Sequence, residues 1–104
     1  MKHLLRANLQ LLISQNIRSQ RKEDIVIEVV RLMLDEPTKL GVFITPALDS
    51  EMLLKKKTAI TKTLLEMYSR YTTAHARLSD IITDVLFELD AHGLDMSVCE
   101  DSLI

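Results

Sequence analysis

Apolar residues recur at three- and four-residue spacing through the 46 residues between Pro46 and Gly93, a stretch without glycine or proline. This spacing is typical of a helix that buries one stripe of side chains against another helix. The stripe, called the seam below, has nine apolar members and one lysine: Leu53, Lys57, Ile60, Leu64, Met67, Tyr71, Ala74, Leu78, Ile81 and Val85. It predicts helix over residues 50–92, with Asp49 or Ser50 as the N-cap.

An unbroken helix over residues 50–92 would be roughly 64 Å long at about 1.5 Å per residue. A domain of this size has a radius of gyration of only about 13 Å. The segment therefore either turns back on itself or leaves the protomer to pair with a second copy. Thr72 and Thr73 are poor helix formers beside the small Ala74, so a reversal there is one possibility and an extended antiparallel dimer is the other.

Two shorter helices are predicted within residues 1–36. The first covers residues 3–17, because its apolar residues share one face: Leu4, Leu5, Leu9, Leu12 and Ile13. The second covers residues 20–35, with Ser19 as N-cap, acids in its early turns and Pro37 beyond its end. Its β-branched residues leave a strand over residues 25–34 as the alternative, although length and the acidic start favour a helix.

Residues 37–49 are interpreted as a connector and residues 93–104 as a tail. The connector holds the apolar run 40–44, which is either packed on the core or an exposed docking segment. Gly93 is a natural helix stop because glycine adopts the left-handed conformation that ends many helices. The sequence thus predicts a single all-α domain of three to four helices. Its long C-terminal helix, or helical hairpin, forms an antiparallel bundle or a coiled-coil-like dimer.

Charge alternates in blocks along the chain. Residues 1–22 carry five basic side chains and no acid, and residues 23–36 carry five acids and one arginine. Residues 51–77 carry six basic and two acidic side chains, and residues 78–104 carry seven acids and no Lys or Arg. Parallel copies of the long segment would repel at their acidic halves, so the charges favour an antiparallel arrangement.

The acidic block suggests a possible partner surface at Asp80, Asp84, Glu88 and Asp90. Glu88 and Asp90 lie in the last turns of a helix, where the carbonyl end disfavours anions, and no nearby basic residue in the sequence offsets them. The simpler interpretation is that these acids are solvated or are paired with the basic residues 1–22. Asp80, Asp84, Glu88 and His92 recur every four residues and so form one ridge of a helix, which suggests a helical-bundle metal enzyme as a weaker alternative.

The basic block offers possible phosphate contacts at Lys55, Lys56, Lys62 and Arg70. A nucleic-acid-associated transcriptional regulator that uses the basic face before residue 77 is therefore an alternative function. Glu51 and Glu66 interrupt the block, so a solvated face or internal ion pairs are expected instead. His75 is expected to be packed beside the seam, and Cys99 to be an ordinary thiol next to acids that raise its pKa.

Composition limits the remaining classes of function. Net charge is −2 and the isoelectric point about 5.9, values that do not suggest non-specific binding to nucleic acid or membranes. The sequence predicts a cytoplasmic protein on three grounds. It has a single cysteine, its apolar runs are shorter than the roughly 20 residues of a membrane span, and its N-terminus does not match a signal peptide. With no catalytic motif and no cofactor expected, the sequence suggests a regulator, adaptor or inhibitor that binds a protein partner through its helices and forms a homodimer or higher oligomer. The apolar residues of the seam are the expected interaction site for these contacts.

Overall fold

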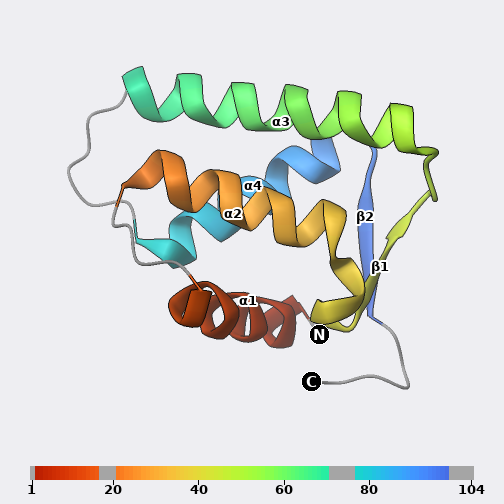
Figure 1. Cartoon of the computed structure of the whole chain (residues 1–104), viewed down its shortest axis with the longest axis horizontal. Coiled ribbons are helices and arrows are strands. Elements are labelled where there is room, and N and C mark those ends of the chain that lie inside the picture. Colours follow the sequence, from red (N-terminus) through yellow and green to blue (C-terminus); the bar gives the residue numbers. More distant parts are fainter. Residues whose placement is uncertain (1, 17–20, 71–76, 99–104) are drawn as a thin grey trace.

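The computed structural model describes residues 2–16, 21–70 and 77–98 (Figure 1). In chain order the elements are α1 (Lys2–Asn16), α2 (Lys22–Asp35), the 3₁₀ helix η1 (Pro37–Leu40), β1 (Val42–Thr45), α3 (Ser50–Arg70), α4 (Leu78–Ala91) and β2 (Asp95–Val98). The fold is mostly helical, as predicted. The radius of gyration is 13.2 Å, so the chain does not extend a 64 Å helix into solvent.

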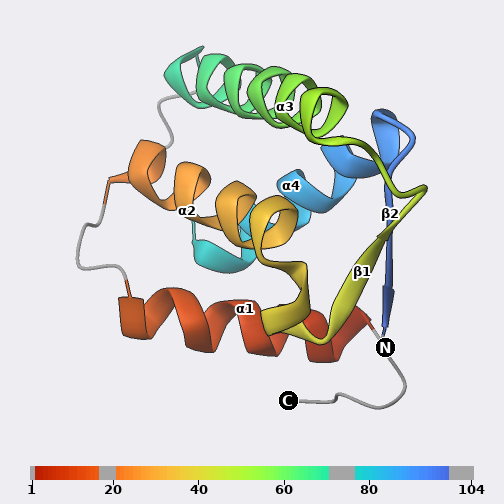
Figure 2. The same cartoon turned by 45° about the vertical axis from the view of Figure 1, so that its right-hand side comes forward.

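Helix α2 lies at the centre of the molecule and contacts α1, α3 and α4 (Figures 1 and 2). Six of its fourteen residues are buried, because the apolar side chains face three neighbours instead of one: Val26, Val29, Val30, Leu32, Met33 and Leu34. The prediction of a helix over residues 25–34 is confirmed, and the strand alternative is wrong. Burial of the three β-branched residues among them, Val26, Val29 and Val30, outweighs their modest preference for strands.

Helices α3 and α4 are antiparallel neighbours within one chain. Tyr68, near the end of α3, donates a hydrogen bond to Asp84 Oδ2 in α4 at 2.5 Å. Lys56, near the start of α3, donates to the carbonyl oxygen of His92, just beyond the end of α4, at 2.9 Å. The helical segment 50–92 therefore turns back on itself. The predicted reversal at Thr72–Thr73 lies outside the described residues.

Two short strands are the part of the fold that the all-helical prediction lacked. β1 and β2 pair antiparallel, with Val42 opposite Val98 and Thr45 opposite Asp95. β1 lies inside the predicted connector and β2 inside the predicted tail, so both assignments need correction. Val42 is buried and Phe43 is 48% exposed, so the apolar run 40–44 is divided between the core and the surface.

The ends of α3 and α4 are fixed by local hydrogen bonds. Asp49 Oδ1 accepts the backbone N–H of Met52 at 2.8 Å, which confirms Asp49 as an N-cap. Gly93 has a φ of 76°, and its N–H donates to the Asp90 carbonyl at 2.9 Å. Leu94 N–H donates to the Leu89 carbonyl at 2.8 Å, which completes a Schellman motif after α4. Ser19, the predicted cap of α2, lies outside the described residues.

Candidate interaction surface

The described residues of the seam face the interior of a single chain. Ile60, Leu64, Ile81 and Val85 are each 0% exposed. The flanking seam residues are partly buried against the same core: Leu53, Met67 and Leu78. Tyr71 and Ala74 lie outside the described residues, as does His75. The seam therefore builds the protomer, and a surface for another molecule has to be sought among other side chains.

Lys57, the polar member of the seam, makes an ion pair between two helices. Its Nζ lies 2.6 Å from Asp35 Oδ2 at the end of α2, and both side chains are about one-third exposed. An acid in the last turn of a helix is unfavourable by itself, and the lysine offsets it. The basic block of α3 thus meets the acidic block of α2.

A second set of charges surrounds Arg31 at the same end of α2. Arg31 pairs with Glu28 on its own helix and, at 2.6 Å, with Glu36 just after it. Glu36 also accepts from Lys39 at 2.9 Å. The hydrogen bonds from Lys39 and Arg31 hold the pKa of the Glu36 carboxyl below its ordinary value. These pairs orient the turn that leads from α2 into η1.

The acidic positions on α4 differ in their surroundings. Asp84 accepts the hydrogen bond from Tyr68, and burial together with this carboxylate raises the pKa of the Tyr68 phenol. Glu88 Oε2 lies 3.9 Å from Nε2 of His92, the residue just beyond the end of α4. Asp80 and Asp90 are exposed. Among residues 2–16, 21–70 and 77–98, no three His, Cys, Asp or Glu side chains gather as metal ligands would.

Helix α1 places one basic residue against α4. Arg6 Nη1 donates to Thr83 Oγ1 on α4 at 2.7 Å. The acceptor of this hydrogen bond is a hydroxyl group and not a carboxylate. The basic helix therefore lies against the acidic one through a neutral contact.

The four predicted phosphate contacts differ in their surroundings. Lys56 is engaged with the His92 carbonyl, and exposed Lys55 lies 3.6 Å from Glu51. Lys62 and Arg70 are exposed along α3, with Glu66 between them in sequence. Acids are thus interspersed among the bases on this helix.

An open groove between α2 and α3 gathers exposed apolar surface. It has a volume of about 520 Å³ and is lined by Ile27, Lys57, Thr58, Thr61, Lys62, Leu65 and Glu66. Ile27 is 47% exposed, although it lies within the most buried helix of the fold. Threonine methyl groups and lysine methylenes add apolar surface to its walls. Below, these seven residues are called the α2–α3 groove.

The apolar wall of the groove continues along α3 toward its start. Leu54, Thr58, Thr61 and Leu65 follow at spacings of four, three and four residues, which places them on one face of the helix. Leu54 is 61% exposed. This face is separate from the seam. The sequence contained a signal for this second face. Leu54 and Leu65 each directly follow a leucine of the seam, so these apolar residues lie outside the single stripe that the seam forms.

Within the described part of the chain, no helix is long and apolar enough to cross a bilayer. Cys99 lies beyond the described residues. Comparison of the chain with protein-family models, curated proteins and solved structures finds no match.

Proposed function

We propose that this chain is a small non-enzymatic interaction module, with a regulatory or adaptor role, that binds an amphipathic helix in the α2–α3 groove. The observation that carries this proposal is the exposure of Ile27 beside Leu65 in a groove of about 520 Å³. Grooves that bind helices present apolar surface to anchor residues spaced three and four apart.

The polar residues around the groove support recognition of a charged amphipathic helix. Lys62 and Glu66 line the groove and place both signs of charge on α3. Apolar contacts supply most of the affinity at such surfaces, while rim charges select the partner's orientation. The antiparallel helical assembly expected from the sequence would then form between this groove and a partner helix.

The proposal can be tested by NMR with isotope-labelled protein and a panel of amphipathic helical peptides that differ in net charge. We expect at least one peptide to shift the backbone resonances of Ile27, Thr58, Thr61 and Leu65. Ile27→Asp should abolish these shifts, whereas Leu11→Asp, at a residue of α1 that is 55% exposed, should leave them unchanged. Shifts confined to α1 or to strands β1 and β2 would contradict the proposal. So would the absence of shifts with any peptide at a concentration where the protein is monomeric.

A further inference from the structure

We infer that the helix bound in the α2–α3 groove is α3 of a second copy of this chain, placed antiparallel by a two-fold axis. This inference rests on the proposed function and names the partner. Two-fold pairing uses the same surface on both copies, so the surface must be complementary to itself in shape and in charge.

The charge pattern on α3 meets this requirement. Lys62 and Glu66 lie four residues apart on exposed positions, and both line the groove. Neither forms an ion pair within the described part of the chain. In an antiparallel pair whose two-fold axis passes at the level of Leu64, Lys62 of each copy lies opposite Glu66 of the other. A parallel pair would instead place lysine beside lysine and glutamate beside glutamate.

The charges of whole helices favour the same arrangement. α3 contains five basic and two acidic residues, whereas α2 contains four acidic and two basic residues. A second copy of α3 lying in the groove would therefore contact a helix of opposite net charge. A second copy of α2 in the groove would instead place two helices of net negative charge beside each other.

Shape and size are also suitable for a second copy. Thr58 and Thr61 are short, so the backbone of a second α3 can approach to the usual 8–10 Å between packed helices. Leu65 and Ile27 then lie at the apolar centre, with Leu54 toward one end. A face one α3 long and two helices wide measures roughly 30 by 20 Å. That is the scale of the roughly 800 Å² per partner found in stable complexes.

Sedimentation velocity over a concentration series, at low salt, tests this inference through charge reversal. Wild-type protein should show a dimer with twice the mass of 11.9 kDa. Lys62→Glu and Glu66→Lys should each raise the dissociation constant by about tenfold or more, because each change creates two like-charge contacts. The double variant K62E/E66K should return to within about threefold of wild type, because it restores both pairs with their signs exchanged.

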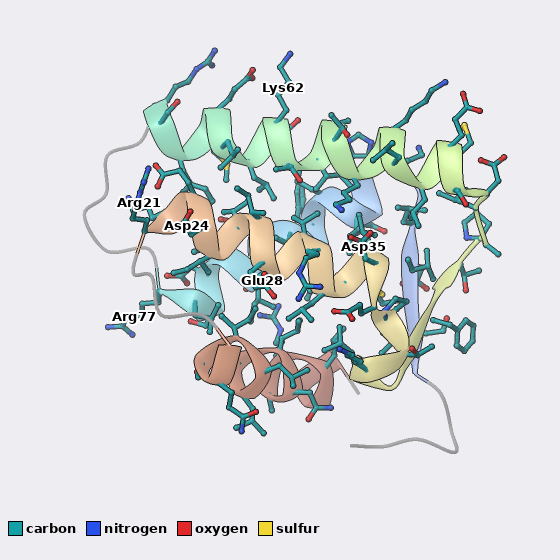
Figure 3. The ribbon with its side chains drawn as sticks, viewed as in Figure 1. Arg21, Asp24, Glu28, Asp35, Lys62 and Arg77 are labelled. Carbon is teal, nitrogen blue, oxygen red and sulfur yellow. The ribbon has the colours of Figure 1, made fainter. Side chains whose placement is uncertain are left out.

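Arg77→Glu is the matched control, since it makes the same charge change as Lys62→Glu at a distant exposed site. Figure 3 shows Lys62 at the outer edge of α3 and Arg77 at the left-hand edge of the molecule, near the start of α4. Arg77→Glu should leave the dissociation constant within about twofold of wild type. All four variants change exposed side chains, so their far-ultraviolet circular dichroism spectra should match that of wild type.

Two results would overturn the inference. A double variant as weak as its worse single variant would show that Lys62 and Glu66 do not face each other across the axis. A protein that remains monomeric at all concentrations would exclude a second copy as the occupant. If the peptides still shifted the groove resonances in that case, the proposed function would stand and only the identity of the partner would be wrong.

Discussion

Lys56 Nζ donates to the carbonyl oxygen of His92 at 2.9 Å, so a lysine from α3 caps the end of α4. α4 carries Glu88 and Asp90 in its last turns, where the helix dipole disfavours anions. Its sequence provides no basic residue to offset them. The lysine comes from 36 residues earlier in the chain, which explains how this helix tolerates an acidic C-terminal end.

Replacing Lys56 by methionine should destabilise the fold by roughly 1–2 kcal/mol, because the carbonyl loses a charged donor while most of the aliphatic packing is retained. Urea unfolding monitored by circular dichroism would measure the change. Lys55→Met is the matched control. Lys55 makes only an exposed pair with Glu51, so its loss should cost less than about 0.5 kcal/mol. Equal effects of the two variants would refute the capping role.

Leu64→Ala should lower the free energy of unfolding by about 2–5 kcal/mol, because it leaves a cavity at a seam position that is 0% exposed. Leu11→Ala makes the same chemical change at a residue of α1 that is 55% exposed, and should cost less than about 0.5 kcal/mol. Denaturant titration of both variants provides the comparison. A Leu64→Ala protein as stable as the Leu11→Ala protein would show that the seam does not build the protomer.

Gly93→Ala should destabilise the protein by roughly 1–2 kcal/mol, because an L-residue is strained at a φ of 76°. A Cβ atom at this position meets nothing within 4 Å, so the effect reports backbone conformation and not a steric clash. Gly93→Asn should recover part of the loss, since asparagine tolerates the left-handed region better than alanine. Thermal unfolding of the three proteins should therefore rank glycine above asparagine and asparagine above alanine.

Tyr68 should make stability depend on alkaline pH. Its pKa is raised in the folded state by burial and by Asp84, while the unfolded value is about 10. The folded state therefore holds the phenol proton where the unfolded state releases it. The resulting stabilisation is complete below about pH 10 and is lost as pH rises toward the folded pKa. Unfolding free energies of wild type and Tyr68→Phe, measured from pH 8 upward, should converge as pH rises; a constant difference would contradict this assignment.

The helices were predictable where they have a local signal. Three such signals lie within a few residues of the structure that they determine: the acidic first turn of α2, Asp49 before α3 and Gly93 after α4. Such local signals could not decide whether residues 50–92 form a hairpin or an extended dimer. The choice depends on contacts such as Tyr68 with Asp84, which are made by residues from different helices.

The two strands and the groove escaped prediction for a related reason. Each strand has four residues, and β1 pairs with a segment about 50 residues away, so neither shows more than one or two alternations of pattern. The groove exists only once α2 packs beside α3. Ile27 is one apolar residue among many in α2, and it lines a groove only because α3 packs beside that helix.

The pairing of β1 with β2 also has a consequence for the order of folding. Its register joins Val42 to Val98, so the intervening chain, with α3 and α4 in it, becomes a closed loop. Helices form from local contacts on the microsecond scale, whereas closing so long a loop demands a larger loss of chain entropy. We therefore expect β1 and β2 to pair late in folding, after α3 and α4 have packed together. Once formed, this pairing should slow the separation of the two helices during unfolding.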